Sequence, residues 1–135
     1  MINKINKQQA IIRIGTRGSP LALMQANEVK SLLVKLNNLP EENIKISIIK
    51  TTGDKILDRP LNSIGGKGLF TKEIEEALIN HKIDIAVHSL KDMPTKQPDG
   101  LLVNCFLERE DPRDAFMSTK IKNHTKLHNN AIIGT

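Results

Sequence analysis

Residues Asp84–Pro94 read Asp-Ile-Ala-Val-His-Ser-Leu-Lys-Asp-Met-Pro, and the rest of the chain is organised around them. The first residues of this stretch are apolar at alternate positions, which is typical of a buried strand in a mixed or parallel sheet. Polar side chains follow at once, namely His88, Ser89, Lys91 and Asp92. Because open α/β sheets bind ligands at the carboxyl ends of their strands, this polar cluster is a candidate site. A solvated turn at a strand end is the alternative, and composition alone does not separate the two.

A strand, a tight loop and a helix are predicted upstream of this stretch. Ile11–Ile14 is a short β-rich run, and Ser19 followed by Pro20 is a helix start, with a hydroxyl cap and a proline in the first turn. Apolar residues then recur at helical spacing to Asn37 or its neighbour. Arg17 therefore lies beside a helix N-terminus, an arrangement that favours an anion such as a carboxylate. A plain connection with a surface arginine is the alternative.

The middle of the chain alternates predicted strand, loop and helix. Ile44–Ile48 has a strand pattern with one polar face, and Thr51–Asp54 is predicted to form a turn. Lys55–Gly66 is predicted to be a long loop, of a length that often binds ligands or covers a site. A helix is predicted over Leu69–His81, because its apolar residues fall on one face.

The glycine segment Gly65–Gly68 precedes that helix and carries one cation, Lys67. It lacks the spacing and the following Ser or Thr of a nucleotide-binding phosphate loop, so we reject that interpretation. Lys67 is instead a candidate contact for a carboxylate or a phosphate, and loop flexibility alone is the alternative.

The last third of the chain predicts two more strands. Leu101–Leu107 is an apolar run in which Cys105 is interpreted as a small buried thiol rather than a nucleophile. Glu108–Asp114 is charged at every position except one, which indicates a crossing between domains. Ala131–Gly134 begins another strand-like run.

The composition is that of an ordinary globular protein, with 39% hydrophobic and 26% charged residues and enough length for one domain with a core. The net charge of +5 favours an anionic partner. Single-stranded nucleic acid is bound largely by aromatic side chains, and the chain has only three Phe and no Trp or Tyr. A polycarboxylate small molecule fits the charge equally well. We expect no nucleic acid as partner, and a basic nucleic-acid binder remains the competing class.

A single Cys excludes an internal disulfide and fits a reducing compartment. No apolar run has the length of a membrane span or the form of a secretion signal, so we expect a cytoplasmic location and no membrane partner. No metal site is expected.

Four segments together resemble the porphobilinogen deaminase (hydroxymethylbilane synthase) family, in the same order along the chain. They are Thr16–Leu23, Gly65–Phe70, Ala86–Pro94 and Arg109–Phe116. Family members are more than twice as long, so the resemblance covers their amino-terminal part. It implies an α/β fold with domains like type 2 periplasmic binding proteins, each a mixed sheet with flanking helices. Residues 1–110 then form an incomplete first domain, and residues 111–135 begin a second.

The resemblance also implies a transferase reaction of porphyrin and haem biosynthesis. Members of the family join four molecules of porphobilinogen on a dipyrromethane cofactor, and each substrate molecule loses ammonia to give an azafulvene cation. Asp92 matches the catalytic aspartate, whose carboxylate stabilises the positive charge on the pyrrole nitrogen. The other matching site positions, for substrate or cofactor, are Arg17, Ser19, Asp54, Lys67, Phe70 and Lys91.

The chain departs from the family pattern in two ways. Thr52 and Ser63 stand where relatives often have basic residues. This weakens the anion binding expected of the segment between the predicted strand Ile44–Ile48 and Gly65. The cysteine that attaches the cofactor lies in a later domain of the family, and Cys105 does not match it. We therefore expect the 135 residues alone to be inactive and to self-associate through exposed sheet edges. A small-anion-binding module of the same fold, without chemistry, is the alternative function.

Overall fold

The computed structural model of the chain describes residues 11–56 and 68–134. The described residues separate into two compact units, with the boundary between Val103 and Asn104. We call the part up to Val103 unit 1 and the part from Asn104 unit 2. The expected domain boundary near residue 110 stays a prediction.

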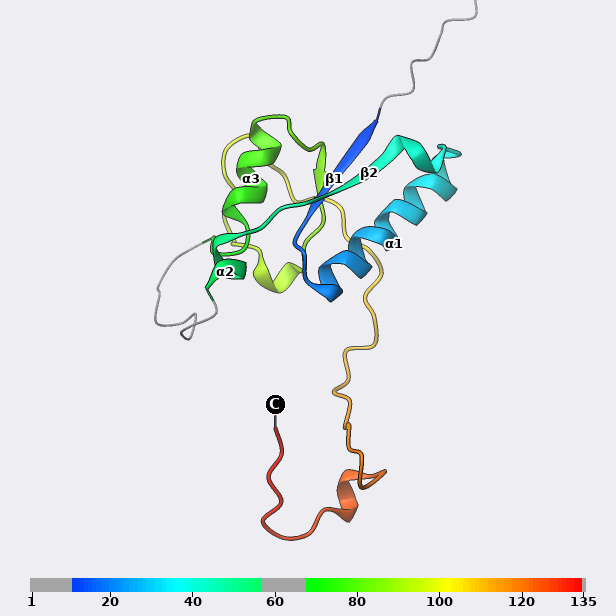
Figure 1. Cartoon of the computed structure of the whole chain (residues 1–135), viewed down its shortest axis with the longest axis vertical. Coiled ribbons are helices and arrows are strands. Elements are labelled where there is room, and N and C mark those ends of the chain that lie inside the picture. Colours follow the sequence, from blue (N-terminus) through cyan, green and yellow to red (C-terminus); the bar gives the residue numbers. More distant parts are fainter. Residues whose placement is uncertain (1–10, 57–67, 135) are drawn as a thin grey trace, which may run out of the picture. The chain divides into compact units, whose positions relative to one another are not determined.

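A parallel sheet of three strands forms the centre of unit 1, in the order β2-β1-β3 (Figure 1). The strands are β1 (Ile12–Thr16), β2 (Ile44–Ile48) and β3 (Ile85–Ala86). All three run parallel, so the antiparallel strand that a mixed sheet requires is not among the described elements. Because parallel strands end at the same edge, the loops that follow all three strands meet there.

Helix α1 (Pro20–Asn37) packs on one face of the sheet, against β1 and β2. Its predicted start is confirmed, since Ser19 Oγ accepts a hydrogen bond of 3.3 Å from the backbone N–H of Ala22. The helix buries Ala26 against Ile14 and Ile44, which are 0% and 2% exposed. The apolar face of the helix and the apolar side chains of the strands therefore pack together in one core.

Helix α3 (Lys72–Ile79) packs against β1 and β3, and its buried residues Ile74 and Ala77 form a second core with Ile83. Gly15 lies in this contact, because a Cβ there would lie 2.2 Å from Ile83 Cδ1. The helix begins later than predicted, since residues 68–71 form a turn in which Gly68 has a φ of 80°. Such a φ suits glycine and interrupts a right-handed helix.

Two short helical elements flank β2 in unit 1. The 3-10 helix Glu41–Asn43 joins α1 to β2, and the four-residue helix α2 (Thr52–Lys55) follows β2. A turn was predicted over Thr51–Asp54, and Thr51 is instead the cap of α2. Most of the predicted loop Lys55–Gly66 lies outside the described residues.

The third strand is anchored to the first by an ion pair as well as by the backbone. Asp84 precedes β3, and its backbone N–H donates to the carbonyl of Arg13 at 2.9 Å. Its carboxylate accepts three hydrogen bonds from Arg13, one from the backbone N–H at 2.8 Å and two from the guanidinium at 2.9 and 2.7 Å. These contacts lower the pKa of Asp84 to about 2.

Unit 2 contains one regular element in its described residues, the 3-10 helix His124–Lys126. The strands predicted at Leu101–Leu107 and Ala131–Gly134 are absent, and Cys105 is exposed, so the buried-thiol interpretation is wrong for this structure. A strand needs a neighbour to pair with, and neither segment pairs with one in the described part of the chain.

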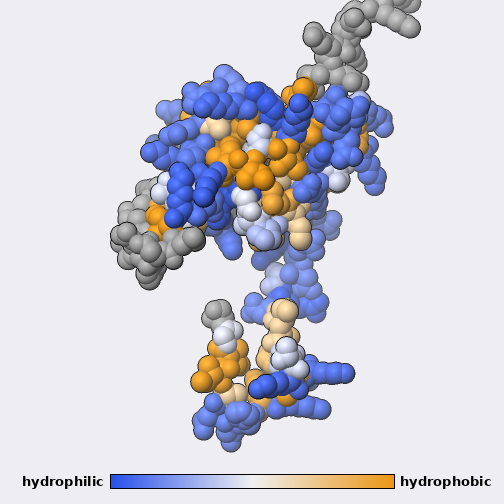
Figure 2. Space-filling view, in the orientation of Figure 1, coloured by the Kyte–Doolittle hydropathy of each residue, from blue (hydrophilic) through white to orange (hydrophobic). Residues whose placement is uncertain are grey.

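Apolar side chains gather over the middle of unit 1 in the space-filling view, with hydrophilic side chains around them (Figure 2). Among the described residues, no helix combines the length and the apolar character that crossing a lipid bilayer requires.

The ion pair of Asp84 predicts how stability depends on pH. The folded pKa of about 2 lies below the ordinary value of 3.8, so the stabilisation is complete above about pH 4 and is lost as the pH falls towards 2. We expect Asp84→Asn to remove this acid dependence from unfolding curves measured between pH 7 and pH 2. The exposed Asp99→Asn is the control, and equal acid dependence in both variants would contradict the assignment.

Candidate functional site

A cavity of about 150 Å³ lies at the carboxyl ends of the strands of unit 1. The loop after β1, the start of α1 and the segment after β3 build its wall. The lining residues are Arg17, Ser19, Leu21, Ala22, Gln25, Val87, His88, Ser89, Lys91 and Asp92. This is the edge at which the sequence predicts a site.

The guanidinium of Arg17 is the centre of the site. Its Nε and Nη2 donate to Asp54 Oδ1 at 3.1 and 2.6 Å, and Nη1 lies 3.6 Å from Asp92 Oδ2. The guanidinium carbon lies 3.9 Å from the centroid of the Phe70 ring, a cation–π stack. Two carboxylates and one ring, from three different segments, therefore fix the position of this cation.

Asp54 has a second function, as part of the cap of α2. Its carboxylate accepts hydrogen bonds from the backbone N–H and the hydroxyl of Thr51, at 3.2 and 2.8 Å. The Asp54 backbone N–H donates to Thr51 Oγ1 in return, which completes a capping box. Burial alone would raise the pKa of Asp54, but the hydrogen bonds from Arg17 and Thr51 outweigh it and lower the pKa. Asp54 is therefore a carboxylate that holds Arg17 in place.

The Phe70 ring reaches Arg17 because Gly53 has no side chain. The backbone N–H of Gly53 donates to the carbonyl of Leu69 at 2.7 Å, which ties α2 to the turn before α3. A Cβ at Gly53 would lie 2.3 Å from the Phe70 ring. No real contact is that short, so glycine is required for the ring to lie where it does.

Asp92 and Lys91 belong to the 3-10 helix Leu90–Asp92, directly after β3. The side chain of Asp92 is 20% exposed, whereas Lys91 is exposed and can move. Ser89 precedes them and donates its hydroxyl to Gln25 Oε1 at 3.1 Å, which joins this segment to α1. The acid is thus held at the cavity wall, with a cation beside it that can reach a ligand.

The structure brings together most of the residues that the sequence predicts. Arg17, Ser19, Lys91 and Asp92 line the cavity, while Asp54 and Phe70 contact Arg17 from outside the lining. The remaining candidate, Lys67, lies outside the described residues.

Sequence reasoning missed Gln25, which lines the cavity. Gln25 lies three residues after Ala22 on α1, and this helical spacing could have placed it on the same face. His88 and Ser89 also line the cavity, and the sequence placed both in the polar cluster without giving either a role.

The charges of the site are balanced in the part of the chain that the structure describes. Arg17 and Lys91 are positive, and Asp54 and Asp92 are negative. Such a site does not simply attract anions, because a carboxylate in the wall repels them. It suits a ligand with a carboxylate at one end and an N–H group or a positive charge near Asp92.

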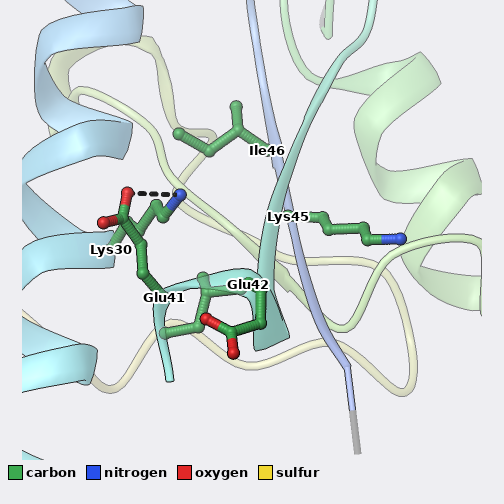
Figure 3. A pocket seen from close by; sticks show the side chains of 6 residues that line it. Lys30, Glu41, Glu42, Lys45 and Ile46 are labelled. Carbon is green, nitrogen blue, oxygen red and sulfur yellow. Dashed lines mark ion pairs between the residues drawn. The ribbon is translucent and has the colours of Figure 1, made fainter. Parts of the chain in front are cut away.

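A second hollow, of about 620 Å³, lies where β2 begins, at the opposite ends of the strands (Figure 3). Glu41 and Glu42 line it from the 3-10 helix, and Lys30 from α1 forms an ion pair of 3.0 Å with Glu41. It shares no residue with the cavity at Asp92, so we do not assign the site to it.

Comparison with known proteins identifies relatives of this chain. A family model described as "Porphobilinogen deaminase, dipyromethane cofactor binding domain" matches residues 12–135. The porphobilinogen deaminase of Paracoccus denitrificans (strain Pd 1222) is 57% identical over 124 residues, which are 92% of this chain and 40% of the relative. The chloroplastic porphobilinogen deaminase of Pisum sativum is 59% identical over 128 residues, which are 93% of this chain and 35% of the relative. The chain thus spans less than half the length of both relatives.

The contact between Gly53 and Phe70 predicts a large effect of one methyl group. We expect Gly53→Ala to lower the free energy of unfolding by about 1–3 kcal/mol, because the ring must move away from Arg17. Urea unfolding measures the loss, and the NMR shift of the Arg17 Nε proton reports whether the ring has moved.

Gly18→Ala is the matched control, because its Cβ would lie 3.3 Å from Cγ2 of the exposed Ile48, a much milder contact. Equal stability of the two alanine variants, with an unchanged Arg17 signal, would show that Phe70 does not depend on Gly53.

Proposed function

The chain belongs to the porphobilinogen deaminase family, and from this premise we propose that unit 1 supplies the part of the active site that carries the catalytic acid. The proposed substrate is porphobilinogen, a pyrrole with carboxylate side chains. The proposed reaction is its head-to-tail polymerisation to hydroxymethylbilane, with loss of ammonia. The observation that carries the proposal is the position of the Asp92 carboxylate, at the cavity wall beside Arg17 and Lys91.

The chemistry explains why an acid belongs in this cavity. When ammonia leaves porphobilinogen, the bond between the methylene carbon and the protonated amine breaks, and the nitrogen keeps the electron pair and departs as neutral ammonia. The pyrrole nitrogen supplies electrons to the methylene carbon, so the positive charge passes to the ring. A carboxylate fixed beside the ring nitrogen stabilises that charge more strongly than it stabilises the neutral ring of the substrate. We assign this role to Asp92.

The carboxylate arms of the substrate need donors and cations. Lys91 is exposed at the cavity and supplies a mobile positive charge, and Ser19 retains its hydroxyl hydrogen while its oxygen caps α1. Arg17 donates its Nε hydrogen and one Nη2 hydrogen to Asp54. We therefore propose that Arg17 orients Asp92, and that only its remaining N–H groups bind a substrate carboxylate.

The described cavity fits one pyrrole ring and not the whole dipyrromethane cofactor. Its volume of about 150 Å³ is below the range of roughly 300–1,000 Å³ that is typical of ligand pockets. The Asp92 carboxylate can accept a hydrogen bond from a ring N–H, and Lys91 and Ser19 can donate to a carboxylate, which suits one ring of that cofactor. When bound, the cofactor supplies the primer on which the pyrrole chain grows. The remaining contacts must come from residues beyond those described, and Cys105 is not proposed as its attachment point.

Two finer assignments are part of this proposal. The parallel order β2-β1-β3, with α1 and α3 against the sheet, supports a domain like those of type 2 periplasmic binding proteins. The cytoplasmic location stays a prediction, since the relative from Pisum sativum is named as chloroplastic. The comparisons give no support to the alternative of an anion-binding module without chemistry.

Removal of the Asp92 carboxylate tests the proposal. Residues 12–135 can replace the matching segment of the Paracoccus denitrificans enzyme, and this chimera provides the reference activity. We expect Asp92→Ala to reduce its turnover of porphobilinogen by about 100- to 1,000-fold or more, because a preorganised charge is lost.

Asp92→Asn keeps the shape of the side chain and should show a similar loss, and Asp99→Ala serves as the control on an exposed acid. Nearly normal turnover by both Asp92 variants would refute the assignment.

A further inference from the structure

Glu73, on α3, is a half-buried acid that the function proposed above does not use. Its Oε1 accepts a hydrogen bond of 2.5 Å from the hydroxyl of Thr52, on α2. Its Oε2 is buried and has no hydrogen-bond partner among the described residues. Because buried polar groups are nearly always paired and a carboxylate loses favourable hydration on burial, a charged side chain at this position requires an explanation.

The carboxyl group of Glu73 is ionised at neutral pH. Burial alone would raise its pKa, but the hydrogen bond from the Thr52 hydroxyl and the backbone N–H groups of Glu73 and Thr52 outweigh it and lower the pKa. The positive charge of Lys55 acts in the same direction. The hydroxyl of Thr52 therefore donates to a charged group, which makes a stronger hydrogen bond than one between neutral groups.

The contact matters because α2 is a single turn of helix that carries two determinants of the site. Its Asp54 accepts the hydrogen bonds from Arg17, and its Gly53 leaves room for the Phe70 ring. A single turn of helix is not stable by itself in water. Contacts outside α2 must therefore set its position and its rotation.

Two contacts join α2 to α3 and to the turn before it. The backbone N–H of Gly53 donates to the carbonyl of Leu69 at 2.7 Å, and the hydroxyl of Thr52 donates to Glu73. Successive residues of an α-helix are turned by about 100°, so Thr52 and Asp54 project from nearly opposite sides of the turn. Glu73 therefore holds one side of α2, while the Asp54 carboxylate projects from the other.

We propose that Glu73 is a positioning residue of the active site, because its carboxylate fixes the rotation of α2 and thereby the direction of the Asp54 carboxylate. Thr52 and Glu73 do not line the cavity. They act through Asp54, which holds Arg17, whose Nη1 lies 3.6 Å from Asp92 Oδ2. Without the hydrogen bond to Glu73, Arg17 shifts together with α2, and Asp92 loses its fixed partner. This inference rests on the function proposed above.

The first experiment follows the Nε proton of Arg17 by NMR in the 135-residue chain, and it needs no substrate. Thr52→Val removes the hydroxyl and keeps the shape of the side chain, whereas Thr52→Ser keeps the hydroxyl and is the matched control. Because Thr52 is exposed, neither variant disturbs the core. We expect Thr52→Val to shift the Arg17 signal and Thr52→Ser to leave it in place. Equal signals in the two variants would overturn the proposal.

The second experiment measures kcat and KM for porphobilinogen in the chimera. We expect Thr52→Val and Glu73→Ala each to lower kcat by about 10- to 100-fold, because a small displacement of the charges in an active site is costly. KM should change little, since Lys91 still binds a substrate carboxylate and only the stabilisation of the transition state by Asp92 is reduced. Glu76→Ala removes an exposed acid from the same helix and is the control.

The double variant distinguishes one shared contact from two independent effects. If the hydrogen bond between Thr52 and Glu73 positions α2, Thr52→Val causes no further loss of kcat when Glu73 is already alanine. Losses that multiply in the double variant, or a raised KM with a normal kcat, would overturn the proposal. If Glu73→Ala does not fold, the comparison of Thr52→Val with Thr52→Ser decides the matter, and equal kcat values in that pair would overturn the proposal.

The two proposals can fail separately. Normal turnover by the Asp92 variants, together with a shifted Arg17 signal in Thr52→Val, would refute the proposed function while supporting the role of Glu73 in positioning α2.

Discussion

The structure of the site depends on the contacts of one guanidinium group. Arg17 is held by Asp54, faces Asp92 and stacks on Phe70, and these partners come from three separate segments of the chain. The parallel strands end at one edge, so each segment arrives there from the same sheet. Because Arg17 has several N–H donors in a fixed plane, one side chain can set the positions of both acids. Asp92, the proposed catalytic acid, is therefore positioned by contacts across the fold and not by its own short helix alone.

The balance of charge determines which ligands this site can bind. A site made only of cations would bind a carboxylate substrate well but would oppose a positive charge on its ring. Here the two acids offset the two cations. The described part of the cavity can therefore hold a ligand that carries both negative and positive charge. The volume of about 150 Å³ limits that ligand, or the part of it bound there, to a small group.

The sequence predicted correctly those elements whose pattern lies within their own residues. The helical spacing and the Ser19–Pro20 start gave α1 correctly, and the alternation at Ile44–Ile48 gave β2. The polar cluster after β3 placed Asp92 at the right edge of the sheet. The contacts of Arg17 could not be predicted, because Asp54 lies 37 residues away and no periodicity links the two. The strand predicted around Cys105 failed for a related reason, since an apolar run becomes a strand only where a partner strand exists.

A crystal structure of this chain with porphobilinogen would show whether Asp92 faces a pyrrole nitrogen. We expect the ring nitrogen within about 3 Å of the Asp92 carboxylate, and one ligand carboxylate at Lys91. We also expect Arg17 to keep its hydrogen bonds to Asp54. A ligand bound in the hollow at the start of β2, or an Asp92 side chain turned away from the ring, would contradict this expectation.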